Sequence, residues 1–297
     1  MTLEQLRIFA AVAEREHVTR AAESLRLTQS AVSEAIQALE SRHDVALFSR
    51  VGRRVELTRD GRAFLDQARA VLRSATDAEL SLSDLRGLKR GQIKLHVSQT
   101  IGAYWLPQRL SRFHAQHPKI AIEMSLGNTD QVAAAVRSGE AEIGFIEGMI
   151  DEGSDLITEQ VDLDKLLIVV GTSHPWSKLR KLAPRHILEA QWIMREPGSG
   201  TRSVFEQALT RHGISPKQLN IALEFPSNEA IRAAVEVGSG LTAISGVVVA
   251  SALKLKMLRA LSFIPLERPF MLLRHAGRSP TYAVQAFLKF IRGRLAR

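Results

Sequence analysis

A short run of polar side chains between residues 29 and 37 has the chemistry needed to read base edges in DNA. On a helix, Gln29, Ser33 and Gln37 would share one outward face, with Ser30 and Glu34 beside them. Glutamine can pair with adenine in the major groove, and a serine hydroxyl can donate or accept hydrogen bonds there. The leading turn carries almost no charge, which predicts that this face reads bases while other residues bind phosphate.

Two helices joined by a tight turn would position that face. Thr19 and Thr28 are suited to be N-caps, the first for RAAESL and the second for QSAVSEAIQALE. Small residues, Ala21 and Ala22, allow the helices to pack closely. The apolar face of the second helix comprises Ala31, Val32, Ala35, Ile36 and Leu39. This pattern is typical of a helix-turn-helix, although the pattern alone leaves open a purely structural helical core with a polar face.

A segment rich in arginine follows the second helix. SRVGRRVELT reads as two short extended pieces around Gly52, with Arg50, Arg53 and Arg54 at the bend. Such a wing would bring its arginines to phosphate or to the minor groove. Thr28 and the first amides of its helix would add phosphate contacts. The wing favours the DNA-binding interpretation over the structural one.

The chain is expected to have three parts. Residues 1–59 form the winged helix-turn-helix, 60–90 a linker and dimerisation helix, and 91–297 an effector-binding domain. The linker helix has apolar residues at near-heptad spacing, which indicates a partner helix. They are Leu65, Ala68, Leu72, Ala75, Leu82 and Leu85. LRGLKRGQ, with two glycines, then ends the helical pattern.

Beyond the linker, short apolar runs alternate with helical segments, which predicts an α/β fold with largely parallel sheets. The length fits two lobes, lobe I at about 91–162 and 267–297 and lobe II at about 163–266. The overall expectation is an α/β protein that joins a winged helix-turn-helix, a long helix and a two-lobed domain.

Composition limits the classes of function. The net charge of +9 and the pI near 10.2 favour polyanionic partners. The excess positive charge lies near the C-terminus, where residues 251–297 include ten basic residues and one acidic residue, Glu267. A solvated basic surface explains this excess. No apolar run is long enough for a membrane helix and no signal peptide is evident, so a cytoplasmic protein without membrane contact is expected.

Enzymatic signals are missing from the sequence. The 297 residues contain no cysteine, GxSxG, P-loop or GxGxxG after a strand. His114 and His117 form an HxxH pair, but no carboxylate or third ligand accompanies it. We therefore expect no enzyme, no cofactor and no metal site.

The run AAESLRLTQSAVSEAIQALE, followed by ALFSR and VELTRDG, closely resembles the N-terminal domain of LysR-type transcriptional regulators, and the order of parts resembles that family over the whole chain. The resemblance implies a dimer of dimers paired through linker helices, an interrupted DNA palindrome upstream of regulated genes, and contact with RNA polymerase. It also implies a solute-binding-like domain that holds a small metabolite between its lobes.

By this resemblance Gln29, Ser33 and Gln37 would touch bases, and the wing arginines would touch the DNA backbone. The sequence departs from the family at Glu34, where a basic or amide residue is common, and a carboxylate there could prefer a cytosine amine or repel phosphate. It departs again at His43-Asp44, which replaces a common Leu-Gly pair at the helix end.

Two strand-to-helix junctions carry hydroxyls and free amides suited to an anion. One is HVSQTIG and the other is GSGTR, each expected to form a wall of the cleft. Their candidate effector residues are Ser98, Gln99, Thr100, Ser199, Gly200 and Thr201. Ordinary N-capping after a glycine turn would explain the pattern in another fold, but in a two-lobed fold ligands bind at the carboxyl ends of strands.

Glu147 ends the apolar strand FIEG and completes the candidate site. It would accept hydrogen bonds from a protonated ligand or neutralise Arg195 or Arg202, with a solvated loop carboxylate as the alternative. REPGSGTR, SQTIG and IEG most resemble the LysR-type regulators of sulfur assimilation and carbon fixation, which makes sulfite or another sulfur oxyanion the expected effector, with sugar phosphates and small carboxylates as alternatives. The competing function is a cytoplasmic solute-binding protein that does not read DNA.

Overall fold

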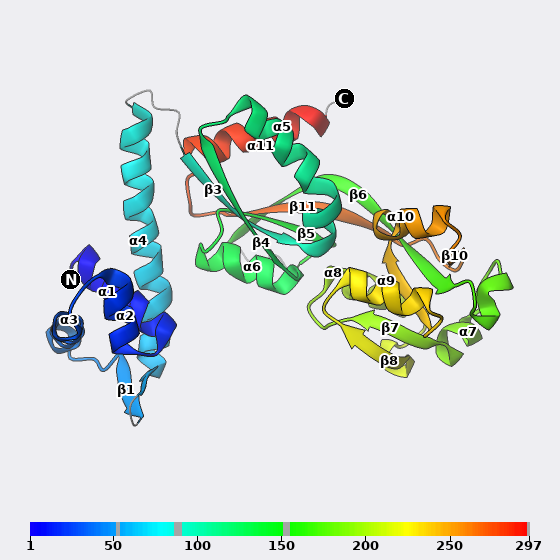
Figure 1. Cartoon of the computed structure of the whole chain (residues 1–297), viewed down its shortest axis with the longest axis horizontal. Helices are drawn as coiled ribbons and strands as arrows, with labels where there is room; N and C mark the ends of the chain where they lie inside the picture. The colour runs from blue at the N-terminus through cyan, green and yellow to red at the C-terminus, as the bar shows by residue number, and fades with distance from the viewer. Residues whose placement is uncertain (52–53, 86–90, 151–154, 296–297) are drawn as a thin grey trace. The chain divides into compact units, whose positions relative to one another are not determined.

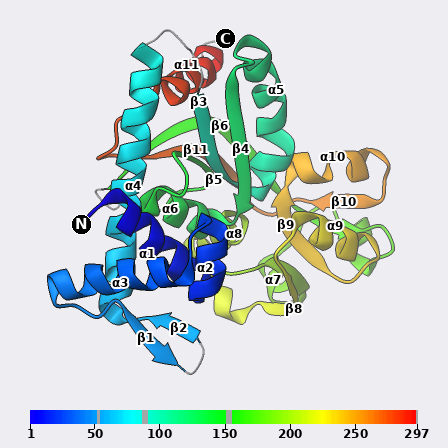
Figure 2. The ribbon, with the colours of Figure 1, turned by 60° about the vertical axis from the view of Figure 1, so that its left-hand side comes forward.

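Helices dominate the first of two units into which the chain divides, residues 1–88 (Figure 1). The computed structural model describes residues 1–51, 54–85, 91–150 and 155–295. The elements of the first unit are α1 (Leu3–Arg15), α2 (Val18–Leu25), α3 (Gln29–His43), β1 (Phe48–Val51), β2 (Arg54–Leu57) and α4 (Arg59–Leu85). Figure 2 shows the short helices gathered about the first turns of α4, while the rest of α4 extends away from them.

The core of this unit explains why these helices pack together. Phe9 of α1 is fully buried and packs against the tilted rings of Phe48 and Phe64, with ring centroids 5.4 and 5.0 Å away. Ala68 and its apolar neighbours on α4 pack against the same cluster. The first turns of α4 therefore bury their apolar stripe within the unit.

The second unit, residues 89–297, is built on one twisted sheet with helices around it. The strand order is β4-β3-β5-β11-β6-β9-β7-β8, with β10 paired to β6. The strands are β3 (Gly91–Ser98), β4 (Ile120–Gly127), β5 (Ile143–Glu147), β6 (Leu156–Gly171), β7 (Gln191–Arg195), β8 (Asn220–Phe225), β9 (Leu241–Ser245), β10 (Leu258–Leu261) and β11 (Glu267–His275). The pairs β3-β4, β3-β5, β7-β8 and β7-β9 are parallel, whereas β11-β5, β11-β6, β6-β9 and β10-β6 are antiparallel. The expectation of a largely parallel sheet is therefore wrong, because the long strands β6 and β11 run antiparallel to each other and to their other neighbours.

Helices cover both ends of this sheet. They comprise the π-helix η1 (Ile101–Trp105), α5 (Leu106–Gln116), α6 (Thr129–Ser138), the 3-10 helix η2 (Pro175–Lys178), α7 (Pro184–Glu189), α8 (Gly200–Arg211), the 3-10 helix η3 (Pro216–Gln218), α9 (Asn228–Glu236), α10 (Gly246–Lys254) and α11 (Tyr282–Leu295). Separate cores mark two lobes, one around Phe113, Phe145 and Phe287 and the other around Trp192 and Phe205. Figure 1 shows β6 and β11 passing from one lobe to the other.

Two local features differ from the sequence expectations. Thr19 is not an N-cap, because α2 begins at Val18 and the extended residue before it is His17. Strand β10 was not expected, since its four residues show no clear apolar alternation and it forms by pairing with β6. Strand β4 lies at the edge of the sheet, and its Leu126 is 57% exposed. Within the described residues, no helix combines the length and apolar character needed to cross a bilayer.

Candidate DNA-reading face and interlobe effector site

The predicted reading face lies at the start of α3. Thr28 caps the helix, its hydroxyl accepting a hydrogen bond from the Ala31 amide at 3.2 Å and lying 3.1 Å from the Ser30 hydroxyl. Gln29 and Ser30 are exposed, and the free amides of the first turn face outward because no intrahelical acceptor precedes them. Ser33 is half-buried, and the exposed side chains of the next turns are Glu34 and Gln37.

Asp44 is the C-cap residue at which α3 ends. It adopts a left-handed backbone conformation with φ of 52°, and its amide donates to the Glu40 carbonyl. Aspartate tolerates this conformation better than most side chains, so the helix ends without the glycine common in the family.

The predicted wing is an antiparallel hairpin. β1 pairs with β2 so that Phe48 lies opposite Leu57 and Arg50 lies opposite Val55. Arg54 begins β2 and pairs with Val51. The backbone of Arg50 and Arg54 is thus placed on the hairpin, whereas Arg53 lies outside the described residues.

Glu40 anchors the hairpin to α3, a role the sequence analysis missed. Its Oε1 accepts hydrogen bonds from the amides of Leu47 and Phe48, at 2.7 and 3.0 Å. Hydrogen bonds to a partly buried carboxylate are stronger than those between neutral groups. The sequence feature that could have predicted this role is a carboxylate near the end of a helix that directly precedes a hairpin.

The candidate effector residues gather where strands from both lobes end. β3 ends at Ser98 and leads into η1, whereas β7 ends at Arg195 and leads into α8. Ser98, Thr100, Ser199 and Thr201 are all at most 2% exposed. The carboxyl ends of the two strands therefore present buried hydroxyls and two helix N-termini to one region.

Two of these hydroxyls have no hydrogen-bond partner among the described residues. They belong to Ser98, from one lobe, and Ser199, from the other. Ser199 occupies the N-cap position of α8 without making a capping hydrogen bond, so ordinary capping does not account for it. A buried hydroxyl without a partner costs about 1–3 kcal/mol, and a bound ligand would remove that cost.

Arg268 is the main residue of the site that the sequence analysis missed. It is fully buried at the start of β11, and its Nε and Nη2 atoms lie 2.8 and 2.7 Å from Oδ2 of Asp164 on β6. Its Nη1 donates to the Thr201 hydroxyl at 2.8 Å and its Nη2 to the Thr100 hydroxyl at 3.3 Å. A charged residue next to the apolar run FMLLRH was the only local signal.

Asn228 is a second residue that was missed. Its side-chain amide donates to the Thr100 hydroxyl at 3.1 Å, and its backbone amide donates to Gln99 Oε1 at 3.2 Å. Gln99 in turn donates to the carbonyl of Pro226. The oxygen and the nitrogen of the Gln99 side-chain amide are thus both used in joining the lobes rather than in facing an open cleft.

Arg195 is neutralised within its own lobe. It binds both carboxylate oxygens of Glu196, at 2.8 and 2.9 Å, and donates to Asn228 at 2.9 Å. Burial alone would raise the pKa of Glu196, but the hydrogen bonds and charge of Arg195 outweigh it and lower that pKa.

Glu147 is buried at the end of β5, but its partners differ from those expected. Its Oε1 accepts from the Thr100 amide at 3.1 Å, and its Oε2 lies 3.9 Å from Arg268. The predicted neutralisation of Arg195 or Arg202 is wrong, because Arg195 binds Glu196 and Arg202 binds two glutamates of its own lobe. The solvated-carboxylate alternative is wrong as well, since Glu147 is 4% exposed.

Close backbone contact joins the lobes beside this site. The Gly200 amide donates to the Thr129 hydroxyl at 3.1 Å, and a Cβ on Gly200 would lie 2.1 Å from the Glu147 carbonyl oxygen. Glycine is therefore required here by space rather than by backbone angle. Glu147, Thr129 and Gly200 also line a cavity of about 370 Å³ between the lobes.

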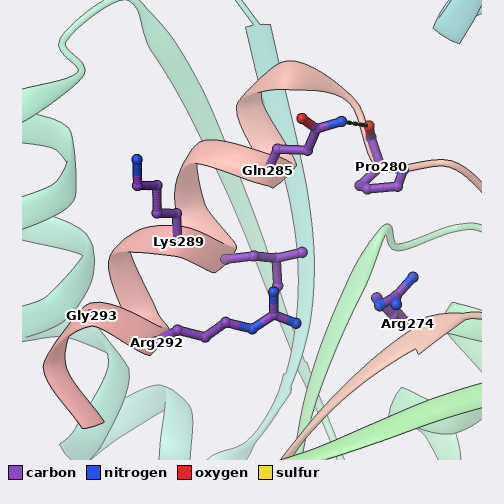
Figure 3. A pocket seen from close by; sticks show the side chains of 7 residues that line it. Arg274, Pro280, Gln285, Lys289, Arg292 and Gly293 are labelled. Atoms are coloured by element: carbon purple, nitrogen blue, oxygen red, sulfur yellow. Dashed lines mark hydrogen bonds between the residues drawn. The ribbon is translucent and has the colours of Figure 1, made fainter. Parts of the chain in front are cut away.

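A second hollow, of about 570 Å³, lies on one lobe along α11 (Figure 3). Its cations are Arg274, Lys289 and Arg292, and Arg292 is bound by Glu159 at 2.5 Å. Lys289 and Arg292 are exposed, as a solvated basic surface predicts. None of the predicted effector residues lines this groove.

The HxxH pair lies at the C-terminal end of α5. His114 is exposed on α5, and His117 ends that helix with its ring 4.7 Å from Phe113. Within the part of the chain that the structure describes, no three histidine or acidic side chains group as a metal site.

Two family models match this chain. The one described as "LysR substrate binding domain" matches residues 86–296, and the one described as "Bacterial regulatory helix-turn-helix protein, lysR family" matches residues 3–62.

Individual relatives and solved structures agree with those matches. A probable RuBisCO transcriptional regulator of Nostoc sp. is 31% identical over 293 residues, covering 96% of this chain and 86% of the relative. The crystal structure of CbnR, a LysR family transcriptional regulator also solved with its target DNA, covers 100% of both chains with a TM-score of 0.72 and 20% identity. The regulatory domain of CcmR from Synechocystis, in complex with 2-PG, covers 69% of this chain and 98% of its own, with a TM-score of 0.63 and 24% identity.

Proposed function

Since the chain belongs to the LysR family of DNA-binding transcriptional regulators, we propose that a small oxyanion held between its two lobes controls how it binds an interrupted palindrome upstream of regulated genes. The family consists of regulators rather than enzymes, as the sequence predicted. Its helix-turn-helix model covers residues 3–62, which leaves no support for a solute-binding protein that does not read DNA.

The proposed reader is α3 together with the hairpin. Gln29, Ser33 and Gln37 contact base edges, and Glu34 favours a cytosine amine. The N-terminal amides of α3 and the hydroxyl of Thr28 bind phosphate. Exposure of the first turn of α3 supports this assignment. The hairpin arginines Arg50, Arg53 and Arg54 complete the phosphate contacts.

The buried hydroxyls of Ser98 and Ser199 are the observation that carries the effector proposal. They come from opposite lobes, have no protein partner among the described residues, and lie beside two helix N-termini. Donors of this kind suit an acceptor-rich anion. Sulfite is the first candidate, followed by other sulfur oxyanions, sugar phosphates, small carboxylates and 2-PG, which the CcmR domain binds.

The proposed active form is a dimer of dimers acting in the cytoplasm with RNA polymerase. Apolar side chains on the edge strands support self-association, among them Met124 and Leu126 on β4 and Leu223 on β8, which are 38%, 57% and 41% exposed. Effector binding shifts the population of lobe arrangements, and the change in oligomer packing alters the spacing of the DNA readers and hence DNA bending.

Footprinting of the purified full-length protein on its own upstream intergenic region tests this function. The experiment is run at fixed salt, with and without each candidate anion, because phosphate contacts make the affinity depend on salt. The expected result is a long protected region that shortens or loses its hypersensitive bend with one compound. Lack of protection under every condition would refute the proposal.

A further inference from the structure

Arg268 joins both lobes through two threonine hydroxyls. Its Nη1 donates to Thr201 on α8 at 2.8 Å, and its Nη2 donates to Thr100 before η1 at 3.3 Å. Both hydroxyls are at most 2% exposed, and Arg268 itself is fully buried. One guanidinium therefore fixes a hydroxyl from each side of the cleft.

These hydrogen bonds determine where the hydroxyl hydrogens can point. A threonine hydroxyl has two acceptor sites and one hydrogen. The Thr100 oxygen accepts from both Asn228 and Arg268, so its acceptor sites are filled and its hydrogen must be donated elsewhere. The Thr201 oxygen accepts from Arg268, and no described residue accepts its hydrogen. Among the described residues, each hydroxyl is therefore a donor without an acceptor.

The charge of Arg268 is already matched by carboxylates. Asp164 binds it through Oδ2 at 2.7 Å, and Glu147 lies 3.9 Å away. A ligand in the cleft thus does not meet an uncompensated arginine. The free binding groups are neutral hydroxyls, those of the two threonines together with Ser98 and Ser199.

We propose that Arg268 is a positioning residue that orients the hydroxyl hydrogens of Thr100 and Thr201 toward one anionic ligand, which is held by neutral donors rather than by a cation. This inference rests on the proposed effector site. It deepens that proposal by identifying how the anion is held, through oriented neutral hydroxyls, and by assigning a role to the buried pair formed with Asp164.

A charge-matched double-mutant cycle on the full-length protein tests the role of the pair. One change is R268Q/D164N, which removes the buried pair without changing the net charge. The other is T100V/T201V, which removes both hydroxyls and keeps the side-chain shape. Titration calorimetry with sulfite, sulfate and inorganic phosphate measures affinity, and thermal-shift titration extends the range to weak binding.

If Arg268 acts through the hydroxyls, the two changes are not additive. T100V/T201V is expected to weaken anion binding on the order of ten-fold per hydroxyl. R268Q/D164N is expected to weaken it about ten-fold alone and to have almost no effect in the T100V/T201V background. The inference would be overturned if R268Q/D164N weakened anion affinity equally in the wild-type and T100V/T201V backgrounds, or weakened it in neither.

Two controls separate this inference from folding and from the wider proposal. T100S/T201S keeps both hydroxyls and is expected to retain affinity. If R268Q/D164N does not unfold cooperatively, R268K takes its place in the cycle. A lysine ammonium cannot reach Asp164 and both hydroxyls at once, so R268K also removes the orienting contacts. If the wild-type protein binds none of the three anions but gives a normal DNA footprint, the neutral-donor site is overturned and the DNA reader is not. If the wild-type protein gives no footprint, the proposed function itself is contradicted.

Discussion

Replacing Gly200 with alanine should separate the lobes without harming the DNA reader. The added Cβ would lie 2.1 Å from the Glu147 carbonyl oxygen and 2.7 Å from the Thr129 hydroxyl, whereas ordinary contact begins at 3.4 Å. The first clash is with backbone, so relief requires a local separation of about 1.3 Å between α8 and the end of β5. Overpacking of this kind typically costs about 1–3 kcal/mol of unfolding free energy.

The assay combines thermal unfolding of the full chain, anion titration and DNA footprinting. G200A should lower the melting temperature and weaken the anion response, while the basal footprint persists. G293A is the matched control, because Gly293 lies in α11 and, beyond its own stretch of helix, no described atom lies within 4 Å of an added Cβ. Alanine there should be neutral or slightly stabilising. If G200A were as stable and as responsive as the wild type, the close contact between the lobes would be refuted.

Three further substitutions probe the reader and the site. Q29A/S33A should abolish the specific footprint and leave salt-sensitive, non-specific binding, and an unaltered footprint would count against α3 as the reading helix. E40A should lower the unfolding free energy by about 1–3 kcal/mol through loss of two amide hydrogen bonds, whereas E40Q, which retains an acceptor oxygen, should lose less; equal losses would contradict the anchoring role. Glu196 has a lowered pKa in the folded state, so its contribution to stability is fully present above its unfolded pKa and is lost as the pH falls through its folded pKa. Urea unfolding between neutral and acidic pH should therefore show a smaller acid loss in E196Q than in the wild type, and identical pH profiles would refute the pairing with Arg195.

Local signals were enough for much of the fold. Helical spacing and a side-chain cap at Thr28 defined α3, and apolar runs marked strands such as β3 and β9, because each depends on neighbours in sequence. The prediction of Thr19 as an N-cap was wrong because a helix can begin at any of several adjacent residues. Here the extended backbone of His17 places the start of α2 at Val18.

The buried network could not be predicted in the same way. Arg268 lies opposite Asp164 in the antiparallel pairing of β11 with β6, 104 residues apart in sequence, and it meets Thr100 across 168 residues. Its partners are therefore set by the tertiary fold and not by local spacing. Alone in sequence, an arginine beside an apolar strand reads as a surface charge. Glu147 was recognised as a site residue, but its partner was misjudged for the same reason.

The most direct test of the central claim is footprinting of S98A/S199A beside the wild type, on the same DNA and with the anion that alters the wild-type footprint. We expect the variant to protect the DNA normally but no longer to respond to the anion, because the two hydroxyls that bind it are gone. A variant that responds like the wild type would show that the effector is held elsewhere, and would contradict control through the interlobe site.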